Sequence, residues 1–137
     1  MNEKLSSTEK NGTLIDLKGS CLCSKVKYQI KGTARNIINC FCEQCRRTSG
    51  HYVAATRVSK ADFELIGQSS LSWFESSPDV FRGFCNQCGG NLFWNEVESN
   101  EISIMAGTLD HPTGLKTIDN ILVDNASDYF EIPSIDV

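Results

Sequence analysis

Residues 21–30 read CLCSKVKYQI, so that two closely spaced cysteines are followed directly by an alternating pattern. In this pattern Val26, Tyr28 and Ile30 alternate with lysine and glutamine. A period of two residues is typical of a strand with one buried face and one solvent face. The stretch therefore predicts a strand that begins at Val26 and carries two thiols just ahead of it.

Other short segments along the chain also have the composition of strands. They are rich in β-branched or aromatic residues and are bounded by Gly, Ser, Asn or Pro. The predicted strands are residues 36–40, 52–58, 63–66, 71–74, 80–84, 91–94, 101–106, 118–123 and 129–132. No long stretch has a helical period, although residues 43–49 are compatible with one or two helical turns ending at Gly50. The sequence therefore predicts an all-β fold with little helix.

The composition is that of a globular protein with one core. The chain has 137 residues, 40% of them hydrophobic and 22% charged, and a formal net charge of −4. No apolar run approaches the roughly 20 residues of a membrane span, which excludes a membrane protein. A net negative charge is unsuited to binding a phosphate backbone, so nucleic acid is disfavoured as a partner.

The N-terminal residues differ in character from the rest of the chain. Residues 1–12 are polar, lack periodicity and have no apolar segment of the kind found in a secretory signal. We predict a disordered tail over residues 1–12, a single domain over residues 13–137 and a cytoplasmic location. A homodimer is expected only because dimers are the commonest oligomers.

Seven cysteines fall into three tight groups. We call these groups the first pair (Cys21 and Cys23), the loop triad (Cys40, Cys42 and Cys45) and the knuckle (Cys85 and Cys88). An odd number of cysteines at such short spacing fits metal ligation better than a closed set of disulfides. The cysteines are therefore predicted to be metal ligands, with Zn²⁺ as the ion.

The grouping of the ligands has two solutions. The knuckle is followed by Gly89 and supplies two of the four ligands of a tetrahedral zinc site. Spacing alone lets this site be completed either by the first pair or by Cys42 and Cys45. We favour the first pair, because the whole loop triad then remains as a compact set of three ligands with an open fourth position.

The chemistry of an open site with three thiolates favours a soft ligand. Three thiolates leave Zn²⁺ a weak Lewis acid, whereas a substrate thiol can bind at the open position as its thiolate. We therefore predict that the loop triad is a catalytic zinc site for a small thiol. Arg46 and Arg47, next to Cys45, are candidates for binding an anionic thiol, and His51 is a candidate for a further contact. Arg82 is expected beside the knuckle.

Several motifs recur together: residues 19–23 followed by Val26 and Tyr28, then residues 40–50, 81–89, 91–94 and 107–110. In this order they resemble the glutathione-dependent formaldehyde-activating enzyme (GFA) family, which includes the centromere protein V-like proteins. The resemblance implies a β-tent fold of short antiparallel sheets, a structural zinc on the first pair and the knuckle, and a catalytic zinc on the loop triad. It also implies the joining of glutathione and formaldehyde. The chain departs from the family at Phe41, where histidine is usual.

Three functions are consistent with these residues. The favoured one is a zinc-dependent carbon–sulfur lyase that acts on an adduct of a small thiol and an aldehyde, as in the synthesis of S-hydroxymethylglutathione. One alternative is a non-catalytic zinc module that binds a protein or a nucleic acid, with two closed sites. The other is a thiol redox enzyme that uses Cys40, Cys42 and Cys45 and holds one zinc.

Overall fold

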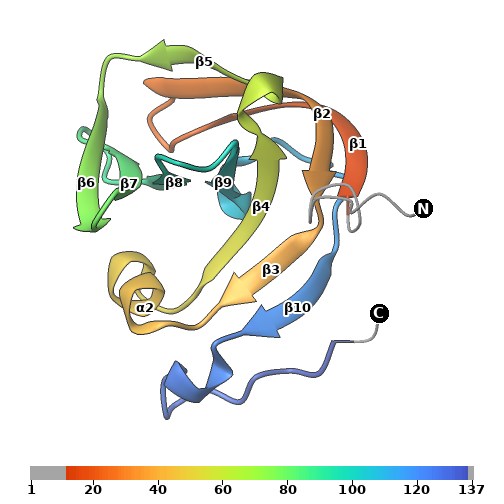
Figure 1. Cartoon of the computed structure of the whole chain (residues 1–137), viewed down its shortest axis with the longest axis vertical. Helices are drawn as coiled ribbons and strands as arrows, with labels where there is room; N and C mark the ends of the chain where they lie inside the picture. The colour runs from red at the N-terminus through yellow and green to blue at the C-terminus, as the bar shows by residue number, and fades with distance from the viewer. Residues whose placement is uncertain (1–11, 136–137) are drawn as a thin grey trace.

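A computed structural model describes residues 12–135 (Figure 1). The strands within this range are β1 (Gly12–Ser20), β2 (Val26–Arg35), β3 (Ile37–Cys40), β4 (Val53–Ser59), β5 (Phe63–Gln68), β6 (Leu71–Ser77), β7 (Val80–Cys85), β8 (Asn91–Glu96), β9 (Glu101–Met105) and β10 (Thr117–Ile121). The α-helix is α2 (Glu43–Ser49), and single 3₁₀ turns are η1 (Lys60–Asp62), η2 (Ala106–Thr108) and η3 (Val123–Asn125). The all-β prediction is confirmed.

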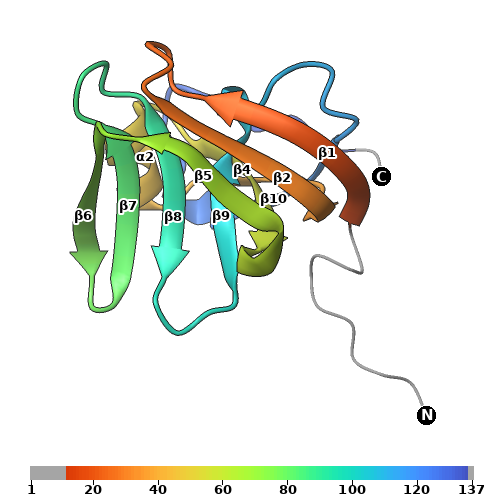
Figure 2. The same cartoon turned by 90° about the horizontal axis from the view of Figure 1, so that it is seen from above.

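The strands form one strongly bent sheet in the order β1-β2-β4-β9-β8-β7-β6. β5 pairs with β2 and β3 pairs with β4, while β10 runs parallel to β3, an exception to the antiparallel pairing that was expected. In Figure 2 the strands β6 to β9 lie side by side, and β1, β2 and β5 cross over them. The bend therefore brings two parts of the same sheet face to face around a core.

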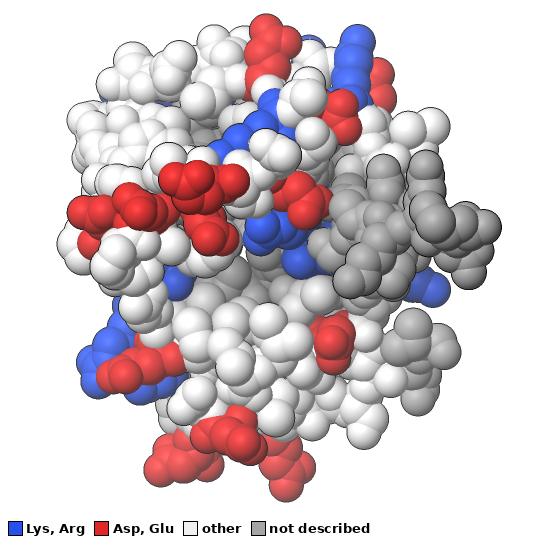
Figure 3. Space-filling view, viewed as in Figure 1, with Lys and Arg blue, Asp and Glu red and all other residues white. Residues whose placement is uncertain are grey.

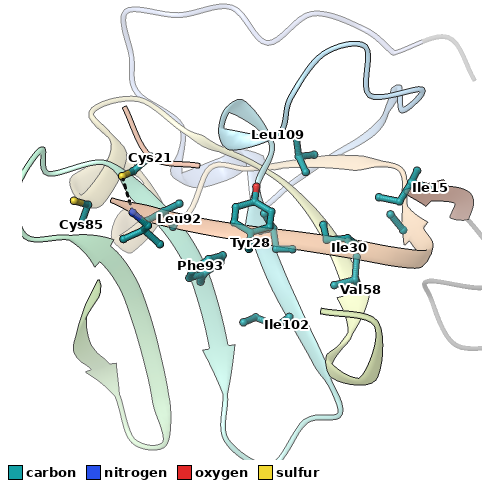
Figure 4. Close-up of a cluster of buried hydrophobic side chains, with 13 residues drawn as sticks. Ile15, Cys21, Tyr28, Ile30, Val58, Cys85, Leu92, Phe93, Ile102 and Leu109 are labelled. Carbon is teal, nitrogen blue, oxygen red and sulfur yellow. Dashed lines mark hydrogen bonds between the residues drawn. The ribbon is translucent and has the colours of Figure 1, made fainter. Parts of the chain in front are cut away.

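The core lies between these two layers. Val26, Tyr28 and Ile30 on β2 are fully buried, as their alternation predicted. The Tyr28 ring packs edge-on against Phe93 of β8, with ring centroids 5.4 Å apart. Figure 4 shows this cluster, with Cys21 and Cys85 at one end of it. Burial of each large apolar side chain contributes roughly 1.5–3 kcal/mol to folding.

The helix prediction is confirmed. α2 spans Glu43–Ser49 and ends at Gly50, whose φ of 90° is the left-handed conformation that glycine adopts at low cost. The Sγ of Cys42 accepts a hydrogen bond from the backbone N–H of Cys45 at 3.2 Å and so caps the N-terminus of the helix. The helix therefore holds two cysteines of the loop triad in a fixed relation.

The sequence pattern missed one strand and predicted another that is absent. β1 was not predicted, because Leu14 is 80% exposed and breaks the inward alternation of Ile15 and Leu17. Residues 129–132 were predicted as a strand and are not one. Their aromatic residues pack on other rings instead, as Phe130 lies 4.5 Å from His51 between ring centroids.

The boundary of the predicted tail falls close to the first strand. β1 begins at Gly12, and the rest of the tail, residues 1–11, lies outside the described residues, as do residues 136–137. Within residues 12–135, no helix has the length and apolar character needed to cross a membrane.

Candidate metal centres

The fold brings the cysteines together as two separate groups. The thiol sulfurs of the first pair and the knuckle lie within 4.8 Å of one another, and so do those of the loop triad. We call the first group the four-thiol cluster. This is the grouping that the sequence favoured, and the alternative, in which Cys42 and Cys45 complete the knuckle, is wrong. Each group could hold a metal ion.

The four-thiol cluster joins distant parts of the chain. The first pair lies in the connection from β1 to β2, while the knuckle lies at the end of β7 and in the turn that leads to β8. The Sγ atoms of Cys21 and Cys23 are 3.6 Å apart, and those of Cys23 and Cys85 are also 3.6 Å apart. A tetrahedron with Zn–S bonds of about 2.3 Å has edges of about 3.8 Å, so these separations fit Zn²⁺.

Backbone amides favour the thiolate form in the four-thiol cluster. The N–H groups of Gln87 and Cys88 both point to the Sγ of Cys85, and the N–H of Val26 points to the Sγ of Cys21, each at 3.4 Å. The backbone N–H of Cys88 makes the largest contribution to lowering the pKa of the Cys85 thiol, which falls to about 6. Amide donors around the sulfurs are typical of cysteines that bind a metal as thiolates.

The loop triad has a local origin. Cys40 ends β3, Cys42 caps α2 and Cys45 lies in the first turn of that helix. Cys45 is buried, whereas Cys40 and Cys42 are half-buried. The hydrogen bond between Cys45 and Cys40 lowers the pKa of Cys40 to about 6 and raises the pKa of Cys45. Three sulfurs supply three of the four positions of a tetrahedral zinc site, which fits an open site.

A buried arginine contacts the loop triad. Both terminal nitrogens of Arg82, on β7, lie 3.9 Å from the Sγ of Cys45. The same side chain donates to Gln44 at 3.3 Å and to Thr48 at 3.5 Å, and it is only 6% exposed. Arg82 was expected beside the knuckle, but its side chain lies against the loop triad instead. A fixed positive charge here offsets part of the negative charge of the thiolates.

A cavity of about 310 Å³ opens beside the loop triad. Its floor is made by residues that alternate along three paired strands, so that each strand contributes every second side chain. These residues are Ile38 and Cys40 of β3, Val53, Ala55 and Arg57 of β4, and Ser103 and Met105 of β9. In Figure 3 this face is hollowed near its centre, with atoms of Lys or Arg side chains at the edge of the hollow.

Two further arginines line the cavity, and neither was among the predicted site residues. Arg35 ends β2, and its Nη2 donates to the backbone oxygen of Ala55 at 2.9 Å. Arg57 contacts Glu101 at 3.4 Å, donates to Ser99 and Ser103, and lies over the ring of Trp94. Arg57 follows Val53 and Ala55 at intervals of two residues along β4. This alternation places all three on one face of the strand and could have identified Arg57 as a residue of the cavity.

The other predicted site residues lie outside the cavity wall. Arg47 is exposed and forms an ion pair with Glu43 at 3.1 Å, and Arg46 is half-buried on the same helix. His51 packs among aromatic rings, stacking on Tyr129 with ring centroids 5.7 Å apart. None of these three predicted residues lines the cavity that holds the loop triad. Their roles in binding stay predictions.

The comparisons with known proteins agree with this geometry. The family model of the glutathione-dependent formaldehyde-activating enzyme matches residues 16–125. The chain belongs to the GFA family. All seven cysteines fall within the matched range, so both thiol groups are part of the GFA-like region.

One solved structure shows the same fold. A crystal structure of a Rhodobacter sphaeroides protein, a structural genomics target, aligns with a TM-score of 0.60 and 17% sequence identity. The alignment covers 74% of this GFA-family chain and 99% of that chain. A comparison with curated proteins gave no match.

Proposed function

We propose that this protein is a zinc-dependent carbon–sulfur lyase that acts on an adduct of a small thiol and an aldehyde. The observation that carries the proposal is the loop triad, whose three sulfurs lie within 4.8 Å of one another in the wall of a cavity of about 310 Å³. Three protein ligands leave the fourth tetrahedral position to a substrate. Membership of the GFA family supports glutathione and formaldehyde as the reference pair.

The two thiol groups have different roles in this proposal. The four-thiol cluster has a full set of four ligands and joins β1–β2 to β7–β8, so its zinc is structural. The loop triad holds the catalytic zinc. Zn²⁺ there would act as a soft Lewis acid that lets the substrate thiol ionise near neutral pH.

The residues around the loop triad prepare the cavity for a thiol. Arg82 places its guanidinium against Cys45 and so reduces the net negative charge that an incoming thiolate meets. Val53, Ala55 and Met105 form an apolar wall that excludes water from the reacting atoms. These groups bind and orient the substrate, while the cap at Cys42 holds the loop in place.

The reaction needs no oxidant. In the direction of synthesis, the substrate sulfur attacks the aldehyde carbon, one carbon–sulfur bond forms and the carbonyl π bond breaks. The proton lost by the thiol ends on the new hydroxyl group, and lysis is the reverse of these steps. The overall change conserves electrons, so the three thiols of the triad act as ligands and not as reductants.

The test is the zinc content per chain, measured by mass spectrometry on protein purified under reducing conditions. A Co²⁺-substituted sample is then titrated with glutathione, and the visible absorption of the cobalt sites reports any change of ligand. We expect two metals per chain and a glutathione-dependent change that Cys42→Ser abolishes. One zinc with three free thiols would favour the redox enzyme. Two metals that respond to no small thiol would favour the binding module.

A further inference from the structure

The cavity has two chemically different ends, joined by an apolar middle. At one end Cys40 of β3 pairs with Val53 of β4, and at the other end Arg57 of β4 pairs with Ser103 of β9. Val53 and Arg57 are four residues apart on an extended strand, which separates their backbones by about 13 Å. A ligand bound to the thiols therefore reaches toward a positively charged region.

Two arginines lie at the end of the cavity away from the thiols. Arg35 and Arg57 both line the cavity, and Glu101 contacts Arg57. Burial, and then repulsion by Arg57, lower the pKa of Arg35, although Glu101 opposes this change. An anion bound at this end would favour the charged form of both guanidinium groups.

The geometry of these guanidinium groups is fixed before any ligand arrives. Arg35 donates through Nε to the backbone oxygen of Asn36 at 3.2 Å and through Nη2 to that of Ala55 at 2.9 Å. Within residues 12–135, no hydrogen-bond partner accepts from its Nη1. The side chain of Arg57 is 20% exposed and lies 5.8 Å from the centre of the Trp94 ring. A planar guanidinium held in this way is suited to a carboxylate.

The rest of the cavity discriminates against an ammonium group. The described residues that line it include no aspartate or glutamate, and its middle is apolar, with Ile38, Ala55 and Met105. Burial of an ammonium group without an anionic partner costs several kcal/mol. Glutathione carries such a group on its γ-glutamyl end, whereas a simple thiol acid does not.

We propose that Arg35 and Arg57 bind a carboxylate carried by the substrate thiol, and that this thiol is a mercaptocarboxylate with an uncharged body. The inference rests on the proposed function, because it takes the loop triad as the place where the sulfur binds. It adds the substrate class: one thiol, one carboxylate and a short apolar chain between them.

The test compares ligands that differ only in charge. Isothermal titration of the two-zinc protein with 3-mercaptopropionate and with 3-mercaptopropionamide measures the contribution of the carboxylate, and the same titration with glutathione measures the cost of the ammonium group. We expect the acid to bind at least about ten-fold more tightly than the amide, and also more tightly than glutathione. Equal affinity for the acid and the amide, or tighter binding of glutathione, overturns the inference.

Variants assign the effect to residues. Arg57→Gln and Arg35→Gln are each expected to reduce the preference for the acid to less than about three-fold, while Lys31→Gln, which removes an exposed charge from β2, leaves it unchanged. The melting temperature of each variant shows whether it folds, and the ligand comparison in the wild-type protein stands without them. If Arg47→Gln removes the preference and Arg57→Gln does not, the assignment is wrong.

The two proposals fail in different ways. If the acid and the amide bind equally and Cys42→Ser removes both, the substrate class is wrong and the thiol site remains. If no thiol binds to the two-zinc protein, the proposed function fails and this inference fails with it.

Discussion

The four-thiol cluster and the loop triad are both built from cysteines, but they differ in where those cysteines lie in the fold. Cys21 and Cys85 are buried at one end of the core and belong to segments far apart in the sequence, so a metal there would cross-link the fold. The loop triad spans only the end of β3 and one turn of α2, and it faces a cavity. The two groups therefore differ in how far apart in sequence their ligands lie, and this is the basis for proposing a structural metal in one and a reactive metal in the other.

The largest effect is expected when the four-thiol cluster is broken. Cys85→Ser removes a buried ligand and leaves the remaining thiolates without their metal, so the melting temperature is expected to fall by more than about 15 °C. Cys42→Ser is the matched control, because serine is itself a favoured N-cap residue and preserves the start of α2. Its melting temperature is expected to change by less than about 5 °C. Differential scanning calorimetry measures both, and equal losses would remove the distinction between the two groups.

Removal of the metals by a chelator is expected to show the next largest difference between the two thiol groups. A chelator added to the two-zinc protein should remove the zinc of the loop triad at least about ten-fold faster, since that site has three protein ligands and borders a cavity. A chromogenic chelator follows the release, and circular dichroism follows the fold. We expect the first zinc to leave with no change of fold and the second to leave with unfolding. Simultaneous release of both metals would contradict this order.

A smaller effect is expected from the arginine on the triad. Arg82→Met removes the positive charge next to Cys45, which is expected to weaken zinc binding at the loop triad by about 10–100-fold and to leave the four-thiol cluster unchanged. The zinc affinity of Arg82→Lys is expected to lie between those of the wild-type protein and Arg82→Met. Lysine keeps the positive charge but cannot contact Gln44 and Cys45 with one planar group. Competition titrations with a chelator of known affinity measure the change. Equal affinity in all three proteins would show that Arg82 has no influence on the metal.

The smallest effect concerns the thiolates themselves. The pKa of Cys40 is lowered to about 6 by the Cys45 hydrogen bond, and that of Cys85 to about 6 by the Cys88 amide, but only Cys40 is accessible. In protein that retains only the structural zinc, alkylation of Cys40 is expected to be fast at pH 7. It should slow as the pH falls through about 6, where the thiolate gains its proton. Mass spectrometry of the peptide locates the label. A midpoint near the ordinary cysteine value of about 8.5 would contradict the shift.

Local sequence patterns predicted several features of this molecule, because the interactions that determine those features are local. The alternation of Val26, Tyr28 and Ile30 identified β2, and the αL position of Gly50 ended α2 as expected. The grouping of the cysteines followed from the number of ligands that a tetrahedral zinc needs.

The remaining features depend on contacts between distant segments. Arg82 meets Cys45 across 37 positions of sequence, and no local pattern shows which face of β7 turns toward the helix. Arg35 and Arg57 become neighbours only when β2 and β4 pair. Residues 129–132 have the composition of a strand, but their aromatic rings pack on Phe41 and His51 instead.

The pairing of β10 with β3 also has a consequence for biosynthesis. The backbone N–H of Phe41, between two cysteines of the loop triad, donates to the oxygen of Ile121, and both Ile121 and Leu122 line the cavity. A ribosome has therefore made all seven thiols by residue 88, but must extend the chain by more than thirty further residues before the cavity wall can close. The thiols of both groups can therefore assemble early, whereas the cavity beside the loop triad is completed last, once β10 has emerged.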